Sequence, residues 1–319
     1  MNDSVHLAVT LGDPAGIGPE VVEHASCLFL QADKSTRLTI VGPQGLVEPM
    51  CGRLGERAQP DAVAPFVGSR GQPSAQSGQA ALATLMRAIE LARRHQVDAI
   101  VTAPISKHAL AMAGSDDRGH TEILARELGV GPTAMSFFTS ELRVVLATTH
   151  VPLHRAIETL TTVRVVEVAV LLHEALLGTL GPKAPRLALA ALNPHAGEAG
   201  LLGDEEELIL APAVAQGRER GLDISGPYPA DTLFFRARSG EFDGIVSLYH
   251  DQALIPVKLL SFGQAVNVTL GLSVPRTSPD HGTAYDKVGT DAIKPDGMLG
   301  ALKAAVLLAQ RQNSCTSST

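Results

Sequence analysis

The 319-residue sequence contains no tryptophan, and aromatic residues make up only 3% of it. A chain so poor in aromatic rings is not expected to build a platform on which bases stack. Its 26 Lys and Arg residues stand against 33 Asp and Glu residues, for a net charge of −7, and the basic residues do not cluster. The sequence therefore predicts a protein that does not bind nucleic acid.

Long apolar runs are also missing, because no segment reaches the roughly 18 residues that a membrane span needs. The start, "MNDSVHLAVTLGDP", has neither the basic segment nor the apolar length of a secretory signal. The three cysteines, Cys27, Cys51 and Cys315, are widely spaced and show no metal-type pairing. These absences predict a cytoplasmic protein that has no membrane partner.

Apolar strand patterns alternate with helical patterns almost throughout, which is typical of an α/β fold with a mostly parallel sheet. The length allows one large domain or two lobes. The predicted strands are residues 5–11, 37–41, 99–102, 143–148, 187–192, 244–249 and 266–270. The predicted helices are residues 19–30, 75–95, 122–128, 163–177, 204–220 and 300–312. The Gly-, Pro- and Ser-rich stretch "DAVAPFVGSRGQPSAQSG" (61–78) is interpreted as a loop that leads into a long helix.

The first strand and helix are joined by a glycine-rich turn. In "VHLAVTLGDPAGIGPEVV", Gly12, Gly16 and Gly18 precede a helix that opens at Pro19. Their spacing matches neither the G-x-G-x-x-G of a Rossmann fold nor the G-x-x-x-x-G-K-[ST] of a P-loop. A tight structural turn and a ligand-binding loop both remain open here.

Three apolar strands are each followed by a histidine: "RVVLATTH" leads to His150, "LALAALNPH" to His195 and "GIVSLYH" to His250. Ligands of open α/β sheets bind beyond the carboxyl ends of the strands, where these imidazoles would converge. Three imidazoles on one metal ion leave positions open for substrate or water, as in catalytic sites. Asp251 and Asp231 could act as further ligands or orient the histidines. The alternative, that each histidine is a structural polar residue, also remains open on the pattern alone.

Other polar residues suggest an anion-binding pocket. "DDRGHTEILAR" places His120 and Thr121 at a helix start, where backbone N–H groups favour an anion, although Thr121 could simply cap the helix. Arg276 is expected in a loop, where its guanidinium suits a phosphate or carboxylate. Further candidates along the chain are Lys107, Lys258, Asn267, Asp280 and His281. Each alone could be a surface salt bridge, but together they predict a small anionic substrate.

The motifs "GDPAGIGPE", "GHTE", "TTHVPL", "NPHAGE", "GPYPADTLF", "YHDQALIPVK", "VNVTLGL" and "RTSPDHGTA" occur in this order over residues 7–286. This series closely resembles the 4-hydroxythreonine-4-phosphate dehydrogenase family of vitamin B6 (pyridoxine) biosynthesis. The first motif is also similar to the "GDGIGPE" turn of isocitrate and isopropylmalate dehydrogenases, which bind NAD without a Rossmann fingerprint. The resemblance implies a two-lobed fold of that type, with mostly parallel sheets, flanking helices and the active site in the cleft between the lobes. Residues 1–118 with 262–319 would form the first lobe, and residues 119–261 the second, with the metal ligands and the dimer interface.

The resemblance implies an oxidoreductase that uses NAD or NADP to oxidise 4-phosphohydroxy-L-threonine at C3. Decarboxylation would then give 3-amino-2-oxopropyl phosphate. His150, His195 and His250 would hold one divalent metal per site (Zn²⁺, Mg²⁺, Co²⁺ or Mn²⁺), which would lower the pKa of the substrate hydroxyl. The implied substrate contacts are His120, Thr121, Lys258, Asn267 and Arg276, and the candidate catalytic residues are Lys258, His120 and Asp251. Either Lys258 or an activated water would accept the hydroxyl proton.

The resemblance also implies a homodimer with shared active sites, in which we expect His250 to reach the metal bound by His150 and His195 of the partner. Paralogues that oxidise 4-phospho-D-threonate or erythronate share most of these motifs, so they stay open as alternatives. The chain has Ala103 in "TAPISKH", where many biosynthetic members have glycine. Enzymes for cyclic dihydrodiol carboxylates lack "GHTE" and the Arg-Thr before "HGTA", which disfavours that branch. A non-enzymatic metal or phosphate binder on the same scaffold is the alternative of a different class.

Overall fold

The computed structural model describes residues 4–117, 119–177 and 184–316. The chain forms two compact units, Met1–Val130 with Leu272–Thr319, and Gly131–Gly271. The sequence predicts these boundaries at 118/119 and 261/262, whereas the structure has them at 130/131 and 271/272. Helix α5 (His120–Leu128) belongs to the first unit because Ile123, Leu124 and Leu128 are buried in that unit's core.

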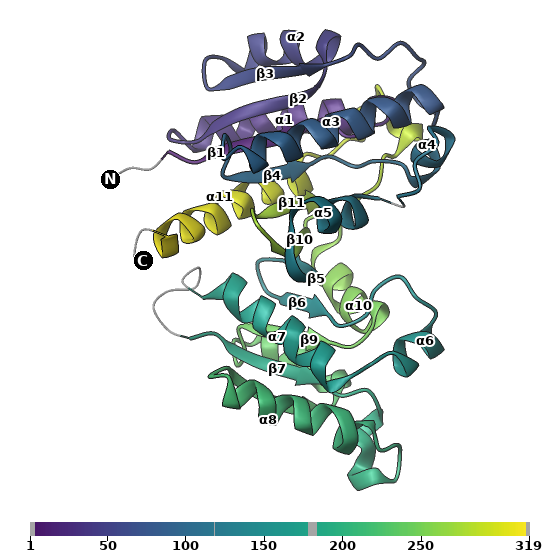
Figure 1. The fold of residues 1–319 in the computed structure, drawn as a ribbon, viewed down its shortest axis with the longest axis vertical. Coiled ribbons are helices and arrows are strands. Elements are labelled where there is room, and N and C mark those ends of the chain that lie inside the picture. Colours follow the sequence, from purple (N-terminus) through teal and green to yellow (C-terminus); the bar gives the residue numbers. More distant parts are fainter. Residues whose placement is uncertain (1–3, 118, 178–183, 317–319) are drawn as a thin grey trace. The chain divides into compact units, whose positions relative to one another are not determined.

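The first unit is built on a parallel sheet with the strand order β3-β2-β1-β4-β11 (Figure 1). Its strands are β1 (His6–Thr10), β2 (Arg37–Pro43), β3 (Ala58–Val63), β4 (Ala99–Thr102) and β11 (Arg276–Pro279). Besides α5, its helices are α1 (Gly18–Ala32), α2 (Gln44–Leu54), α3 (Ala75–Arg93), α4 (Lys107–Met112) and α11 (Asp296–Thr316), with a short 3-10 turn at Tyr285–Lys287.

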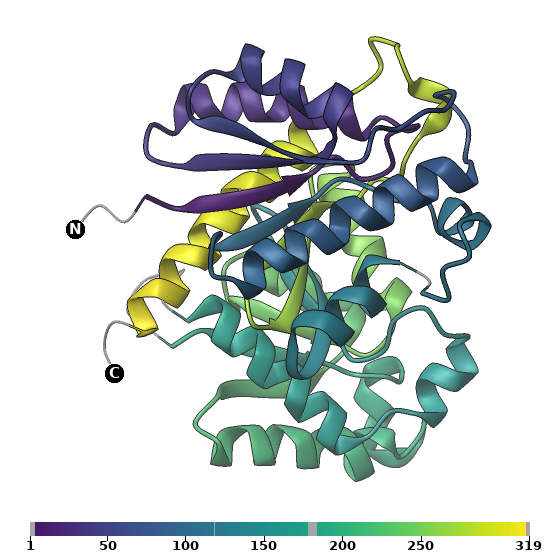
Figure 2. The same cartoon turned by 45° about the horizontal axis from the view of Figure 1, so that its top comes forward.

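Helices cover both faces of this sheet, which is why the central strands β1 and β4 are buried along almost their whole length. The apolar face of α3, which lies across the strands in Figure 2, packs its Leu85 and Ile89 against Ala8 and Ile100. Helix α3 starts sharply because Ser74 and Ser77 form a reciprocal capping box. Helices α1 and α11 pack against one another. This layering brings the carboxyl ends of β1, β4 and β11 to one edge.

The second unit has the strand order β10-β5-β6-β9-β7-β8. Its strands are β5 (Gly129–Phe138), β6 (Arg143–Leu146), β7 (Arg186–Ala190), β8 (Asp223–Tyr228), β9 (Gly244–Ser247) and β10 (Val266–Leu272). Strands β5 and β6 are antiparallel, whereas β6, β9, β7 and β8 are parallel. The helices are α6 (Leu153–Glu158), α7 (Thr162–Leu176), α8 (Ala211–Glu219), α9 (Ala230–Arg238) and α10 (His250–Ser261), with shorter turns at Pro194–Gly200 and Glu206–Leu210.

One face of this second sheet is covered by α9 and α10, whose Leu233, Ala253 and Val257 share a core with Val144 and Ile245 of the strands. Helix α7 packs on β6 and β9 and contacts α8. Because β6, β9 and β7 are parallel neighbours, the segments that carry His150, His250 and His195 all leave the same edge of this sheet.

The predicted α/β class, with a mostly parallel sheet, is confirmed, but two local predictions, both of loops, are wrong. Arg276 is the first residue of β11 rather than a loop residue, because it pairs with Ile100 of β4. His250 follows β9, as predicted, and is also the first residue of α10. The stretch interpreted as a loop begins inside β3, whose edge position leaves it largely exposed and without an apolar pattern. The helix predicted at residues 204–220 is present, as a π-helical turn at Glu206–Leu210 that continues directly into α8. Within the part of the chain that the structure describes, no helix has the length and apolar character needed to span a membrane.

Candidate functional site

Arg276, the first residue of β11, is only 3% exposed, and its side chain reaches the carboxyl end of the neighbouring strand β4. Its Nε and Nη2 atoms donate to Oγ1 of the buried Thr102, the last residue of β4, at 3.1 and 2.6 Å. Burial lowers the pKa of Arg276 to about 9, because the charged guanidinium loses its water. A buried cation of this kind gains stability from an anion placed beside it.

His120, the first residue of α5, lies close enough to Arg276 for the charge of the guanidinium to act on the imidazole ring. Burial and then the Arg276 charge hold the pKa of His120 well below its usual value, so the ring is neutral at neutral pH. Among the described residues its buried Nε2 atom has no hydrogen-bond partner. Gly119 is the N-cap residue of helix α5, and no side chain from the described part of the chain caps the helix, so the capping role considered for Thr121 is not observed. A neutral imidazole and an uncapped helix start therefore lie near a buried guanidinium.

The glycine-rich turn between β1 and α1 packs tightly inside the first unit. Gly12 has φ of +65°, and a Cβ atom there would lie 2.3 Å from the carbonyl oxygen of Pro104. The fully buried Asp13 accepts hydrogen bonds from Tyr285 Oη at 2.7 Å and from Ser77 Oγ at 3.2 Å. Arg70 donates to the Gly16 carbonyl at 2.7 Å. Close backbone packing thus accounts for the turn, and no Rossmann-type fingerprint is needed.

In the second unit, the rings of His150 and His250 have centroids 5.6 Å apart. Both lie beside an open pocket of about 280 Å³ lined by residues of two strand-end segments: Thr149, His150, Val151, Leu153, Ala156, Tyr249, His250 and Asp251. His250 Nδ1 is 2.7 Å from Asp251 Oδ1, so with Nδ1 donating, Nε2 keeps the lone pair that a metal binds. Zinc binds imidazole nitrogen at about 2.0–2.1 Å. At that bond length, the centroids of two imidazole rings on the same zinc ion lie roughly 5–6 Å apart. This pair of histidines therefore fits a shared metal ion.

His195 does not complete that group within one chain. Over the described residues there is no set of three His, Cys, Asp or Glu side chains placed to hold a metal. His195 is exposed and sits in the turn Pro194–Gly200, where five consecutive residues adopt left-handed backbone angles. For residues other than glycine such angles cost about 1–2 kcal/mol each. The chain therefore holds His195 in a special local conformation but leaves it away from the other two rings.

Gln252 connects the strand ends that precede these histidines. Its Oε1 accepts from the Leu248 N–H at 2.7 Å, and its Nε2 donates to the Ala191 carbonyl at 2.7 Å. The Thr148 hydroxyl donates to the Leu248 carbonyl at 2.7 Å. The segments that carry all three histidines are thus fixed to one another, two residues before His150 and His250 and four residues before His195.

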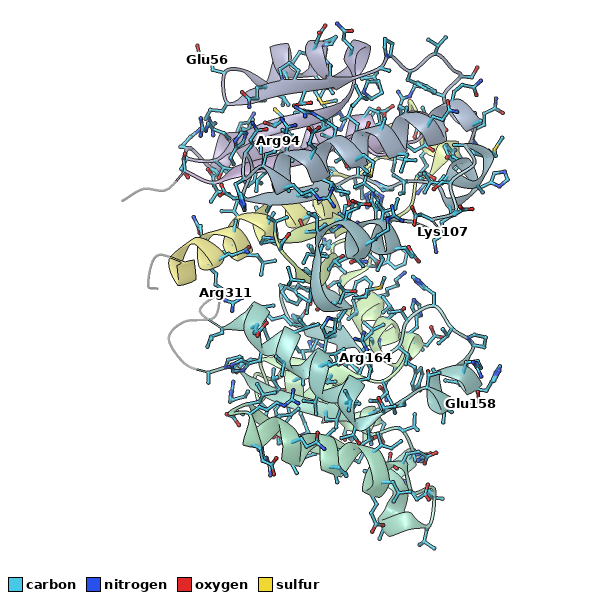
Figure 3. All side chains as sticks on the ribbon, in the orientation of Figure 1. Glu56, Arg94, Lys107, Glu158, Arg164 and Arg311 are labelled. Atoms are coloured by element: carbon cyan, nitrogen blue, oxygen red, sulfur yellow. The ribbon has the colours of Figure 1, made fainter. Side chains whose placement is uncertain are left out.

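The remaining predicted residues are spread over both units. Lys258 is half-buried in the last turn of α10, and Asn267 lies in β10 with a buried Oδ1 that has no partner among the described residues. His281 has a similar buried Nε2 in the first unit. Buried polar atoms without partners commonly mark places that a ligand or water satisfies. Asp231 is exposed in the first turn of α9, and Lys107 is exposed at the start of α4 (Figure 3), so neither contributes a buried charge.

Sequence reasoning missed Thr102, Asp13, Gln252 and the buried Glu206, all of which hold other site segments in place. Thr102 is the last residue of one predicted strand and Asp13 lies two residues after another, and this strand-end position was a usable signal. Nothing in the local sequence pattern marks Gln252 or Glu206, because Gln252 joins Leu248 to Ala191, which lies 61 residues away, and the partners of Glu206 lie 13 and 14 residues away.

The fold is shared with solved structures of α/β enzymes that catalyse different reactions. A crystal structure of a β-decarboxylating dehydrogenase from Thermococcus kodakarensis matches 97% of this chain and 84% of its own, with a TM-score of 0.53 and 15% identity. A phosphotransacetylase from Streptococcus pyogenes shares the fold to a similar degree (TM-score 0.56, 12% identity), so this likeness defines the architecture and not the reaction.

The family model described as "Pyridoxal phosphate biosynthetic protein PdxA" matches residues 32–305. The chain belongs to this family. A 4-hydroxythreonine-4-phosphate dehydrogenase from Beijerinckia indica is 44% identical over 303 residues, covering 89% of each chain. A D-threonate 4-phosphate dehydrogenase from Salmonella typhimurium is 40% identical over 330 residues, covering 95% of this chain and 98% of its own.

Solved structures agree with this assignment. The 4-hydroxythreonine-4-phosphate dehydrogenase from Klebsiella pneumoniae has a TM-score of 0.83 and 36% identity, covering 97% of this chain and 99% of its own. A terephthalate 1,2-cis-dihydrodiol dehydrogenase from Burkholderia xenovorans is less similar, with a TM-score of 0.70 and 29% identity over 96% and 98% of the two chains. The protein is thus an oxidoreductase of the PdxA family, and membership implies NAD(P) as the hydride acceptor.

Proposed function

We propose that the protein oxidises 4-phosphohydroxy-L-threonine at C3 with NAD or NADP and releases CO₂ from the resulting 2-amino-3-oxo acid. The product is 3-amino-2-oxopropyl phosphate, and the reaction is a step of pyridoxine biosynthesis. The observation that carries this proposal is the buried Arg276 beside the neutral His120, which suits the phosphate of such a substrate. Thr121, the next residue of α5, supplies a hydroxyl and a free helical N–H in the same place.

A divalent metal ion, held by His150, His195 and His250, would supply a Lewis acid for the hydroxyl and for the ketone that replaces it. The His150–His250 spacing and the donor set of the pocket support this assignment, and Zn²⁺, Mn²⁺, Co²⁺ and Mg²⁺ are the candidates. Asp251 orients the His250 ring through its hydrogen bond. Lys258 and Asn267 would bind the polar groups of the substrate, with Lys258 or a water accepting the hydroxyl proton.

We further propose that the protein is a homodimer in which each metal site takes His195 and His250 from different chains. Two observations support a second copy. One chain does not assemble three ligands from its described residues, and α10, which opens with His250, exposes an apolar stripe. Ile255 and Leu259 of α10 and Phe262, its C-cap residue, are 65%, 83% and 84% exposed, at spacings that place them on one side of the helix. A copy that covers this stripe would also lie next to His250.

A second candidate, the oxidation of 4-phospho-D-threonate or erythronate, is favoured by the D-threonate 4-phosphate dehydrogenase relative, which is about as similar as the 4-hydroxythreonine-4-phosphate dehydrogenases. Both substrates carry the phosphate, so the Arg276 cluster does not separate them. The lower identity of the dihydrodiol enzyme gives that branch less support. A purely binding role would leave the nicotinamide cofactor unreduced.

The deciding experiment compares kcat/KM for 4-phosphohydroxy-L-threonine and 4-phospho-D-threonate side by side, each with NAD and with NADP. We expect the amino acid substrate to give the higher value. A higher value for 4-phospho-D-threonate would instead assign the protein to the second candidate, and no reduction of either cofactor would contradict both.

A further inference from the structure

Glu206 is a buried carboxylate that has no place in the chemistry described so far. It is 7% exposed and opens the π-helical turn Glu206–Leu210. Its Oε1 accepts from the backbone N–H groups of Leu192 and Asn193 at 2.8 and 2.7 Å. Its Oε2 accepts from Asn193 Nδ2 at 2.9 Å. Three donors from the end of one strand segment thus converge on a single side chain.

Those donors immediately precede the left-handed turn that carries His195. His195, Ala196, Glu198 and Ala199 have φ values of 52°, 55°, 44° and 56°, with Gly197 at 78° between them. A run of such angles persists only where surrounding contacts impose it. The Glu206 contacts fix the two residues just before the turn, so they set where the turn begins.

Glu206 also lies against Gly197, at the centre of the turn. A Cβ atom added at Gly197, the buried residue of the turn, would lie 2.9 Å from Glu206 Oε2. The same carboxylate therefore holds the entry to the turn and lies against its centre. Glu205 assists from outside, because its Oε2 accepts from Asn193 Nδ2 at 2.7 Å.

We infer that Glu206 is a positioning residue that aims His195 at its metal ion by anchoring the left-handed turn Pro194–Gly200. The inference rests on the proposed metal site. A carboxylate suits this role because all its neighbours are donors, whereas an amide would turn an NH₂ group toward at least one of them. Glu206→Gln therefore conserves the size of the side chain and disturbs only the anchoring contacts.

The test measures Zn²⁺ binding by titration calorimetry on the full-length, metal-stripped protein, at a temperature where every variant is folded. The variants are Glu206→Gln, Gly197→Ala, His195→Ala and, as a matched control, Glu207→Gln on the exposed side of the same turn. Changes in the groups that orient a metal ligand typically weaken metal binding 10–100-fold, so we expect Glu206→Gln to weaken Zn²⁺ binding at least about tenfold. Gly197→Ala should do the same without altering the carboxylate, and Glu207→Gln should bind like the wild type.

The results separate the two proposals. If His195→Ala loses Zn²⁺ while Glu206→Gln and Gly197→Ala bind it like the wild type, the positioning role is wrong and the metal site stands. If His195→Ala binds Zn²⁺ as tightly as the wild type, the proposed metal site itself is wrong and the inference falls with it. Should Glu206→Gln fail to fold, the Gly197→Ala measurement decides in its place.

Discussion

Arg276 donates two hydrogen bonds, from Nε and from Nη2, to the single hydroxyl oxygen of Thr102. The two residues come from neighbouring parallel strands and are 174 positions apart in the sequence. One edge of the guanidinium is thereby fixed to the sheet, which orients the rest of the group. This arrangement makes Arg276 the best-defined residue of the proposed phosphate site.

Replacing Arg276 should weaken substrate binding far more than cofactor binding. Loss of one charge-assisted contact to a phosphate costs about 1.5–3 kcal/mol, or roughly ten- to a hundredfold in affinity. We expect Arg276→Ala to weaken substrate binding by this amount. Arg276→Lys should weaken it less, because lysine keeps the positive charge but lacks the paired N–H donors of the guanidinium. Arg94→Ala, at an exposed arginine of the first unit (Figure 3), is the control. Equal losses of substrate and cofactor affinity would show that Arg276 has been misplaced.

The neutral His120 should make the protein less stable in mild acid. Its folded pKa lies well below 6.5, whereas in the unfolded chain the ring binds a proton near pH 6.5. Below that pH the unfolded state takes up a proton that the folded state does not, so stability is full above about pH 6.5 and falls as the pH drops toward the folded pKa. His6, whose pKa burial also lowers, adds to this slope.

Thermal unfolding followed over a pH series checks the effect. His120→Gln should reduce the decrease in Tm below about pH 6.5 without removing it, since His6 remains. His24→Gln, on the exposed side of α1, should follow the wild-type curve. Identical pH profiles for His120→Gln and the wild type would contradict the assignment of a neutral, buried His120.

The sequence was sufficient for the class of fold because hydrophobic periodicity reports burial directly. Strand β4 was predicted with its bounds because all four of its residues are buried in a parallel sheet. Strands β3 and β8 lie at sheet edges and carry polar or proline residues, so they have no such pattern. The short β11 was missed because its sequence, Arg-Thr-Ser-Pro, contains no apolar run although all of it is buried.

The site was only partly predictable for a related reason. A strand followed by a histidine is a local pattern, and it located the segments of His150, His195 and His250. The left-handed angles at His195 follow two residues that bond to Glu206, which lies beyond the turn, and no local residue preference indicates them. Likewise, the partner that orients Arg276 comes from a strand far away in the sequence.

Turnover should require a divalent metal. Treatment with a chelator should abolish cofactor reduction, and Zn²⁺, Mn²⁺, Co²⁺ or Mg²⁺ should restore part of it, because three imidazoles bind such ions. His195→Ala should remain inactive when the metals are returned. Full activity of this variant in a preparation shown by elemental analysis to be free of metal would overturn the requirement.

Mixed dimers test whether His195 and His250 of one site belong to different chains. Inactive His195→Ala and His250→Ala chains, unfolded together and refolded, should regain activity, because each hybrid would hold one intact site and one doubly damaged site. Hybrids that form but stay inactive would place both residues in the same chain.

A second mixture, of His150→Ala and His250→Ala chains refolded together, tests whether His150 and His250 of one site belong to the same chain. Recovered activity would place His150 and His250 of one site on different chains, as we expect from the sequence. Its absence would mean that His150 and His250 act as the close pair seen within one chain.

The most direct test of the proposed reaction is its stoichiometry with 4-phosphohydroxy-L-threonine. Reduced nicotinamide cofactor and released CO₂ are measured in the same sample, with and without chelator. An oxidation followed by decarboxylation predicts one CO₂ for each cofactor reduced when metal is present, and neither product after chelation. Cofactor reduction without CO₂, or equal turnover after the metal has been removed, would contradict the account.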